Sequence, residues 1–155
     1  VPFVNMNGLD VDTWGAELAA DWRLAGDRWR LRPAYSYLHM RADALNGVDP
    51  RVEEVGGENP EHQWSLWLST NVAGDVQLDG VLRYVDGLPT HGFDAYLVAD
   101  ARVGWQVTSG VELELVGRNL FDSRHPEFQA FFINSVPTLT QSEMYVRLHW
   151  HLPKE

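Results

Sequence analysis

Residues 96–107 read YLVADARVGWQV, and apolar and polar side chains alternate along this stretch with a period of two. One face carries Leu97, Ala99, Ala101, Val103, Trp105 and Val107, and the other carries Tyr96, Val98, Asp100, Arg102, Gly104 and Gln106. Because successive side chains of a strand point to opposite faces, the alternation predicts a β-strand with one apolar and one polar face. Strands of globular proteins usually have about 5 or 6 residues, whereas a tilted strand that crosses a bilayer needs about 9 to 11. The length therefore favours a membrane strand.

The same alternation recurs in six other segments. They are residues 14–24, 28–37, 63–72, 76–84, 111–118 and 143–152. We therefore expect seven long strands, with a truncated eighth before Asn7. Two residues disturb the pattern. Pro33 cannot donate a ladder hydrogen bond and should mark a β-bulge, and Gly80 should weaken its strand locally.

The connections between these segments alternate between short and long. Residues 25–27, 73–75 and 108–110 are tight turns that contain glycine, which readily adopts the positive φ of short hairpins. Long polar links cover residues 42–61, 86–94 and 122–140. Short turns at one end and long loops at the other are typical of outer-membrane barrels, in which the short turns are periplasmic.

Aromatic residues are frequent, with seven Trp, five Tyr and six Phe in 155 residues. On the apolar faces they fall near strand ends, at the short-turn end (Trp22, Trp29, Trp105 and Trp150) and at the long-loop end (Trp64, Tyr84, Tyr35 and Tyr37). Two such girdles are typical of membrane interfaces, whereas a soluble β-sandwich would place aromatic residues toward strand centres. The sequence predicts an all-β fold of antiparallel up-and-down transmembrane β-barrel strands, in contact with outer-membrane lipid.

Several function classes are disfavoured by composition. The absence of cysteine excludes a disulfide framework, a thiolate metal site and a cysteine nucleophile. A net charge of −10 disfavours nucleic acid as a partner. We find no nucleophile with a base, no phosphate-binding loop and no paired-acid motif, so we expect neither an enzyme nor a cofactor. His149 and His151 share one face and could chelate a metal, but no third ligand is in view, so we predict no metal site.

Specific motifs narrow the family. The run Asn119-Leu120-Phe121-Asp122 follows an alternating segment and precedes the last one, and it resembles the signature that closes the penultimate strand of TonB-dependent receptors. Residues 5–18 are similar to the Asn…Gly…Gly-x-Glu-Leu stretch of that family, through Asn5, Gly8, Gly15, Glu17 and Leu18. Residues 59–63 and 83–86 continue the resemblance, which covers nearly the whole chain.

The resemblance implies a receptor of about 22 strands around a plug domain. Residues 1–155 would then be the C-terminal portion of the barrel, about eight strands, without the plug and the earlier strands. Such receptors sit in the bacterial outer membrane and bind a scarce solute of the ferric siderophore, haem or cobalamin class. The expected partners are the plug, the remaining strands and the TonB complex, which acts through the missing N-terminal part.

Two alternatives remain open. Eight strands can close into a small self-contained outer-membrane barrel with a structural or adhesion role. A soluble lipocalin-type barrel fits less well, because the polar faces lack the large apolar residues that a ligand cavity needs.

Candidate functional residues lie on the polar faces and in the long loops. The polar faces carry Glu17, Asp21, Arg23, Arg32, Asp79, Arg83, Asp100, Arg102, Glu112, Glu114, Arg118 and Arg147. We expect these charges to pair across strands and to face the plug, with a transport path as the alternative. The predicted ligand contacts in the extracellular loops are His91, Phe93, Phe128, Phe131 and Phe132, with Ile133 beside them, although the same residues could instead pack the loops together.

Overall fold

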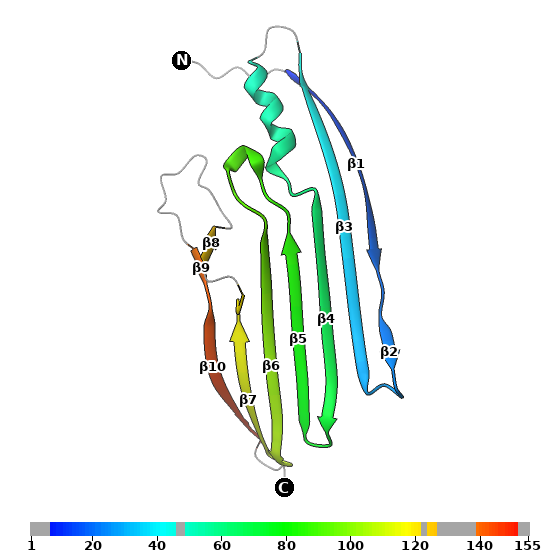
Figure 1. Cartoon of the computed structure of the whole chain (residues 1–155), viewed down its shortest axis with the longest axis vertical. Helices are drawn as coiled ribbons and strands as arrows, with labels where there is room; N and C mark the ends of the chain where they lie inside the picture. Colours follow the sequence, from blue (N-terminus) through cyan, green and yellow to red (C-terminus); the bar gives the residue numbers. More distant parts are fainter. Residues whose placement is uncertain (1–6, 46–48, 122–123, 127–138, 152–155) are drawn as a thin grey trace.

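The computed structural model describes residues 7–45, 49–121, 124–126 and 139–151. Their main feature is one antiparallel sheet in the order β1-β3-β4-β5-β6-β7-β10, with β2 paired to β3 beyond the end of β1 (Figure 1). The strands are β1 Leu9–Ala19, β2 Trp22–Leu24, β3 Trp29–Ala44, β4 His62–Ala73, β5 Val76–Val85, β6 Tyr96–Thr108, β7 Val111–Arg118 and β10 Glu143–Trp150. All seven predicted segments form strands, but segment 14–24 is divided into β1 and β2, and β3 continues to Ala44, beyond the predicted end at residue 37. The predicted truncated eighth strand falls on residues 1–6, outside the described part of the chain.

The short and long connections lie at opposite ends of the sheet (Figure 1). The β2–β3 turn contains three consecutive residues in the left-handed region, Ala25, Gly26 and Asp27, with φ of 54°, 67° and 66°. Such turns match the right-handed twist of the strands they join. Register shifts occur beside the other two short turns, between Asn71 and Ala73 and between Gln106 and Thr108.

The long connections contain regular structure that alternation could not reveal. The 3-10 helix η1 spans Pro50–Glu58, and η2 spans Pro89–His91. A small hairpin pairs β8 (Arg124–Pro126) with β9 (Leu139–Gln141). No helix in the described ranges is both long enough and apolar enough to cross a membrane.

The prediction that Pro33 marks a β-bulge is wrong. Ala19 pairs with Ala34 and Trp22 pairs with Leu31, so the register is the same on both sides of the proline. The edge strand is instead interrupted between β1 and β2, opposite Pro33, because proline has no N–H to donate to the ladder. At Gly80, β5 continues without interruption.

The sheet has one apolar and one polar face, as the alternation predicts. Register across six strands aligns apolar or small side chains on one face, for example Leu31, Leu68, Gly80, Ala101, Gly117 and Met144. Large apolar side chains on this face are strongly exposed, among them Leu18 at 71% and Trp150 at 70%. Exposed apolar surface of this extent needs an apolar cover, which membrane lipid provides for a barrel.

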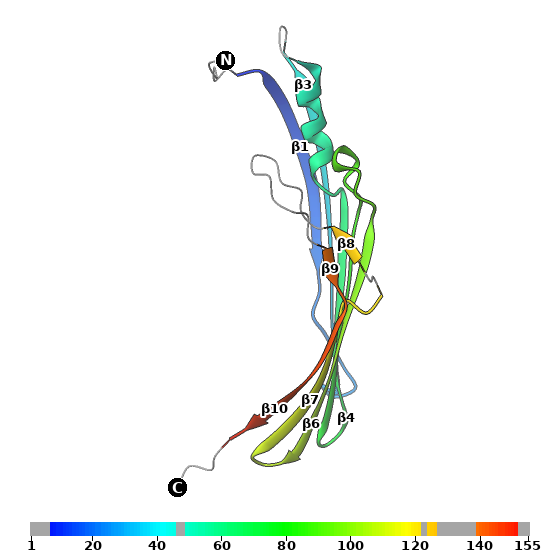
Figure 2. The same cartoon turned by 90° about the vertical axis from the view of Figure 1, so that its left-hand side faces the viewer.

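The described sheet is a single curved layer and is open (Figure 2). Strands β1 and β10 lie at its two edges, and no ladder joins them in the described residues. No side chain there is both large and completely buried. The sheet therefore has no core of its own, and each face depends on something outside it for cover.

Candidate functional site

An aromatic row marks the long-loop end of the apolar face. The rings of Trp14 and Tyr37 meet edge to face with centroids 5.1 Å apart, and Tyr37 stacks on His62 at 5.0 Å. Farther along the sheet, Trp64 and Tyr84 stack at 5.9 Å. The apolar faces of neighbouring strands lie on the same side of the sheet. These rings therefore form a near-continuous row across β1, β3, β4 and β5.

A second aromatic level, which includes Trp22 and Trp29, lies at the short-turn end of the same face. Trp22 follows Trp14 by eight residues, which is about 27 Å along a strand. At a tilt of about 40° this distance spans roughly 20 Å of membrane height, close to the apolar band of about 25 Å in outer-membrane barrels. The apolar face therefore has the dimensions of a lipid-facing barrel wall.

The polar face carries a charge cluster around Arg102 on β6. Its guanidinium lies 2.7 Å from Asp79 on β5, 2.7 Å from Glu112 and 2.8 Å from Glu114, both on β7. Antiparallel register produces the arrangement, because Asp79 is the direct partner of Arg102. Gly104 leaves the room for it, since a Cβ there would come within 2.9 Å of the guanidinium.

Glu114 connects this cluster to the last strand. It is 5% exposed, and its second oxygen lies 3.3 Å from Arg147 and 3.4 Å from His149 on β10. A buried carboxylate is costly unless it is paired, and here cations approach it from two strands. The predicted cross-strand pairing of polar-face charges is confirmed at these positions.

Asn119 of the Asn-Leu-Phe-Asp run has a structural role at the end of β7. It adopts the left-handed region with φ of 50°, which Asn tolerates better than most residues, and it is 3% exposed. Its backbone N–H donates to Asp100 over 2.9 Å, and the next N–H, of Leu120, donates to the carbonyl of Ala99. The motif therefore turns the chain away from β7 while remaining bonded to β6.

A second polar-face cluster was missed by the sequence reasoning. Trp67 on β4 lies opposite Arg32 on β3, and the Arg32 guanidinium carbon is 4.8 Å from the indole centroid. The guanidinium of Arg30 is 6.0 Å from the same ring. Asp21 lies beside both arginines, 2.9 Å from Nε of Arg30 and 3.3 Å from Nε of Arg32. The sequence holds a signal for this position, because Trp67 lies two and four residues from the polar-face residues Ser65 and Gln63 and therefore shares their face.

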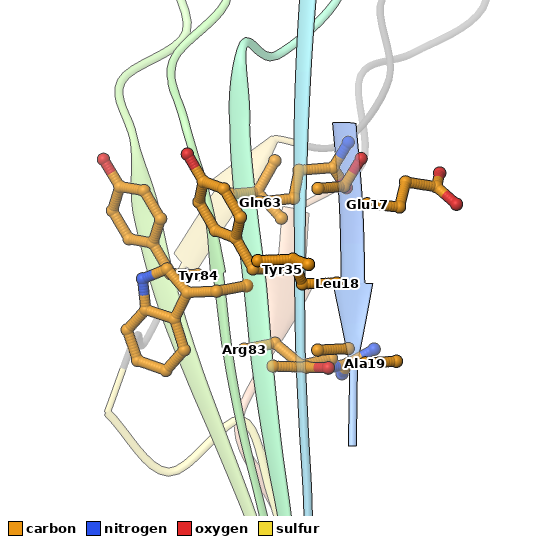
Figure 3. A pocket seen from close by; sticks show the side chains of 12 residues that line it. Glu17, Leu18, Ala19, Tyr35, Gln63, Arg83 and Tyr84 are labelled. Carbon is orange, nitrogen blue, oxygen red and sulfur yellow. The ribbon is translucent and has the colours of Figure 1, made fainter. Parts of the chain in front are cut away.

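A hollow of about 610 Å³ lies beside this cluster, toward the long-loop end. Small residues of its lining on the polar face are Ala19, Ala34, Ser36 and Ser65, with Glu17, Gln63 and Arg83 around them. Figure 3 shows Tyr35 and Tyr84 pointing to one side of the sheet and Glu17 to the other. The hollow is an open groove and not an enclosed cavity, and its lining also includes Leu18, Tyr35, Trp64 and Tyr84 from the intervening positions of the strands.

At the long-loop end, η1 and η2 form one platform. The hydroxyl of Thr90 in η2 donates to the carbonyl of Glu54 in η1 over 2.8 Å. Gly56 holds η1 close to β3, because a Cβ there would lie 3.0 Å from the carbonyl of Met40. Two loops that are distant in sequence are thus connected.

The platform presents two of the predicted ligand contacts together. The rings of His91 and Phe93 lie with centroids 5.9 Å apart, on either side of Gly92, whose φ is 66°. Leu88 and Phe93 close the turn through a β-bridge. The other predicted contacts, Phe128, Phe131 and Phe132, with Ile133, lie outside the described residues, so their part in the cluster stays a prediction.

In the described ranges, no group of three or more His, Cys, Asp or Glu side chains is arranged so that it could hold a metal ion. His149 contacts Glu114 instead, and the backbone N–H of His151 donates to the carbonyl of Gly110 over 2.8 Å.

Comparison with known proteins places these features in a family. The family described as TonB dependent receptor-like, beta-barrel matches residues 2–120. The catecholate siderophore receptor Fiu of Escherichia coli (strain UTI89 / UPEC) is 31% identical over 131 residues, covering 76% of this chain and 16% of the receptor.

Solved structures share the fold. The siderophore receptor PiuA from Acinetobacter baumannii gives a TM-score of 0.68 at 20% identity, covering 92% of this chain and 22% of that one. FpvA from P. aeruginosa, in complex with heterologous pyoverdine and iron, gives 0.67 at 18% identity, covering 90% and 19%. The chain spans only about 16% of the length of the curated relative. Its strands, its two faces and the match over residues 2–120 lead to one conclusion: the chain belongs to the β-barrel family of TonB-dependent receptors.

Proposed function

We propose that the protein containing this chain is a TonB-dependent uptake receptor of the bacterial outer membrane, and that residues 1–155 form the C-terminal portion of its barrel. The observation that carries the proposal is the two-sided sheet, with aromatic rows on its apolar face and paired charges on its polar face. A wall of this kind suits lipid on one side and a wet, plugged lumen on the other. The partners would be outer-membrane lipid, the plug, the remaining strands and the TonB complex.

The open sheet supports a larger barrel over the self-contained eight-stranded alternative. A small closed barrel pairs its first and last strands, because an unpaired edge leaves backbone donors and acceptors without partners inside lipid. In the described residues β1 and β10 stand at opposite edges. Further strands would supply the missing partners.

The proposed solute is a ferric siderophore. Haem and cobalamin are the alternative solutes. The names of the relatives support the first class, since Fiu is described as a catecholate siderophore receptor and PiuA as a siderophore receptor. The proposed contacts are His91 and Phe93 on the platform, together with Phe128, Phe131 and Phe132. Loops held by a rigid scaffold commonly carry binding residues. Nothing in the arrangement suggests catalysis, and the relatives are named as receptors.

The test is uptake by the full-length protein in an E. coli strain that lacks its own catecholate receptors. Cells would be given radioactive iron as its complex with 2,3-dihydroxybenzoate, with a ferric hydroxamate, haem and cobalamin in parallel. We expect uptake of one class that requires an intact TonB. Uptake of none of the four solutes, or uptake that persists without TonB, would contradict the proposal.

Ligand contact is tested separately by the double substitution His91→Ala and Phe93→Ala. Loss of two aromatic contacts should weaken surface binding of the transported chelate by about tenfold or more. The matched control is Asp94→Ala, because Asp94 is an exposed residue of the same loop. Equal binding by the double variant and the control would remove these two residues from the site.

A further inference from the structure

The platform of η1 and η2 is built around two consecutive glycines. The two helices lie side by side at the long-loop end of the sheet (Figure 1). A Cβ at Gly56 would lie 3.0 Å from the carbonyl of Met40 in β3, and a Cβ at Gly57 would collide with the hydroxyl of Thr90 in η2. η1 therefore lies against β3 on one side and against η2 on the other, at distances that a residue with a side chain would not allow.

η1 lies on the side of the wall that is polar within the membrane. Met40 and Ala42 are on the same side of β3 as Arg30 and Arg32, because residues two apart in a strand share a face. The side-chain amide of Asn59, directly after η1, donates to the sulfur of Met40 over 3.8 Å, and Ala42 is buried. The platform is thus attached to the lumen side of β3, where β3 continues beyond the aromatic row.

The turn that contains η2 is closed by hydrogen bonds of its own backbone. The N–H of Leu88 donates to the carbonyl of Phe93 over 2.9 Å, and the carbonyl of Leu88 accepts from the N–H of His91 at 3.0 Å and from that of Phe93 at 3.2 Å. Pro89 begins η2 with a fixed φ, and Gly92 ends it in the left-handed region. The backbone positions of both ring-bearing residues are therefore fixed by one partner, Leu88.

One side-chain hydrogen bond connects this closed turn to η1. The hydroxyl of Thr90 donates to the carbonyl of Glu54 over 2.8 Å, and Thr90 directly precedes His91. The contact at Gly57 lies at the same threonine. The orientation of η2 relative to η1, and through η1 relative to β3, is therefore set at Thr90. A loop that is already ordered avoids the entropic cost that a free loop incurs when it binds.

We propose that Thr90 and Gly57 are positioning residues, which hold the rings of His91 and Phe93 in their binding arrangement before the solute arrives. They act through the two rings and do not touch the solute. The competing arrangement is a lid, in which the loops are loose in the free receptor and become ordered only on binding. The proposal rests on the proposed function for the ligand contacts, whereas the order of the free platform can be measured without any solute.

The first experiment is hydrogen exchange in the full-length receptor in detergent, without solute, resolved to peptides by mass spectrometry. The peptide that covers residues 86–95 should be protected in the wild type, because its backbone hydrogen bonds are formed. Gly57→Ala should speed exchange in this peptide, since the added Cβ displaces Thr90. The matched control is Glu58→Gln, at an exposed neighbour in η1, which should leave exchange unchanged.

The second experiment measures binding to whole cells of radioactive iron as its complex with 2,3-dihydroxybenzoate, with the ferric hydroxamate, haem and cobalamin as parallel probes. Thr90→Val should weaken binding of the transported probe about two- to tenfold, the range expected when one hydrogen bond is lost. Thr90→Ser keeps the hydroxyl and should bind like the wild type. Glu58→Gln is again the control and should bind equally well.

Double-substitution cycles separate positioning from a general loss of structure. In a receptor that carries His91→Ala and Phe93→Ala, Thr90→Val should cause no further loss of affinity, because the rings through which it acts are gone. Gly57→Ala should weaken binding on its own. It should cause no further loss beside Thr90→Ala, where the hydroxyl that the new Cβ would meet is absent.

Three results would overturn the inference. They are rapid exchange of residues 86–95 in the free wild type, unchanged binding by Thr90→Val, and losses that add fully in both cycles. The failure of each proposal is distinguishable. A receptor that takes up one of the probes while its free platform exchanges rapidly refutes the positioning alone. A free platform that is protected in the wild type and loosened by Gly57→Ala, in a receptor that takes up none of the four probes, refutes the proposed function alone.

Discussion

A pair of arginine substitutions on β4 tests which face of the sheet contacts lipid. Leu68 lies on the apolar face, four residues from Trp64 and four from Val72, and pairs with Leu31 and Gly80. Its neighbour Ser69 lies on the polar face, between Arg30 and Asp79 in register. Leu68→Arg and Ser69→Arg therefore place the same side chain at nearly the same depth on opposite faces.

The magnitude follows from the depth of Leu68. Four residues of strand are about 14 Å. At a tilt of about 40° this distance puts Leu68 roughly 10 Å below the aromatic row, near the middle of the apolar band. An arginine on the lipid face at the bilayer midplane costs about 2–4 kcal/mol. This range corresponds to a fall of roughly 30- to 700-fold in the folding equilibrium constant, at about 1.4 kcal/mol per factor of ten.

The polar-face substitution should be nearly neutral. An arginine at position 69 would lie between the guanidinium of Arg30 and the carboxylate of Asp79, so repulsion from one neighbour and attraction to the other should largely offset each other. Surface substitutions of this kind usually change stability by no more than about 0.5 kcal/mol. The pair therefore isolates the cost of lipid contact from the cost of introducing an arginine into β4.

The assay is reversible urea unfolding of the full-length receptor in lipid vesicles, followed by tryptophan fluorescence. We expect the free energy of unfolding to drop by about 2 kcal/mol or more for Leu68→Arg and to stay almost unchanged for Ser69→Arg. Equal losses for the two variants, or a larger loss for Ser69→Arg, would refute the assignment of the two faces.

Three further substitutions test contacts within the sheet and the loops. Arg102→Gln leaves the buried carboxylate of Glu114 without its main partner and should lower the free energy of unfolding by about 2–3 kcal/mol. The control Arg23→Gln, at an exposed ion pair, should change it by less than about 1 kcal/mol, and urea unfolding of both variants measures the difference. Gly15→Ala places a Cβ against the backbone carbonyl of β3 and should destabilise by more than about 1 kcal/mol, while Gly74→Ala, with open space around it, should be neutral. Thr90→Val removes the hydrogen bond between η2 and η1, and faster hydrogen exchange confined to these two loops should follow; unchanged exchange would show that the bond does not hold the platform together.

The sequence determined the strands, their faces and the girdles. All three depend on local properties: a side-chain period of two, the positive φ available to Gly26, and the distance of aromatic residues from the strand ends. The motif around Asn119 also pointed to the right family. These features need no knowledge of which strand lies beside which, and so they could be predicted one segment at a time.

Only the tertiary structure decided which residues meet. A period of two fixes the face of Arg102 but not its partner on the next strand, and shifts such as the one between Gln106 and Thr108 change the register without altering the alternation. For the same reason the contact of Trp67 with Arg32 became visible only once β3 and β4 were aligned. In the platform of η1 and η2, the hydroxyl of Thr90 donates to the carbonyl of Glu54, a residue 36 positions earlier in the chain, and no periodicity of the sequence encodes such a bond.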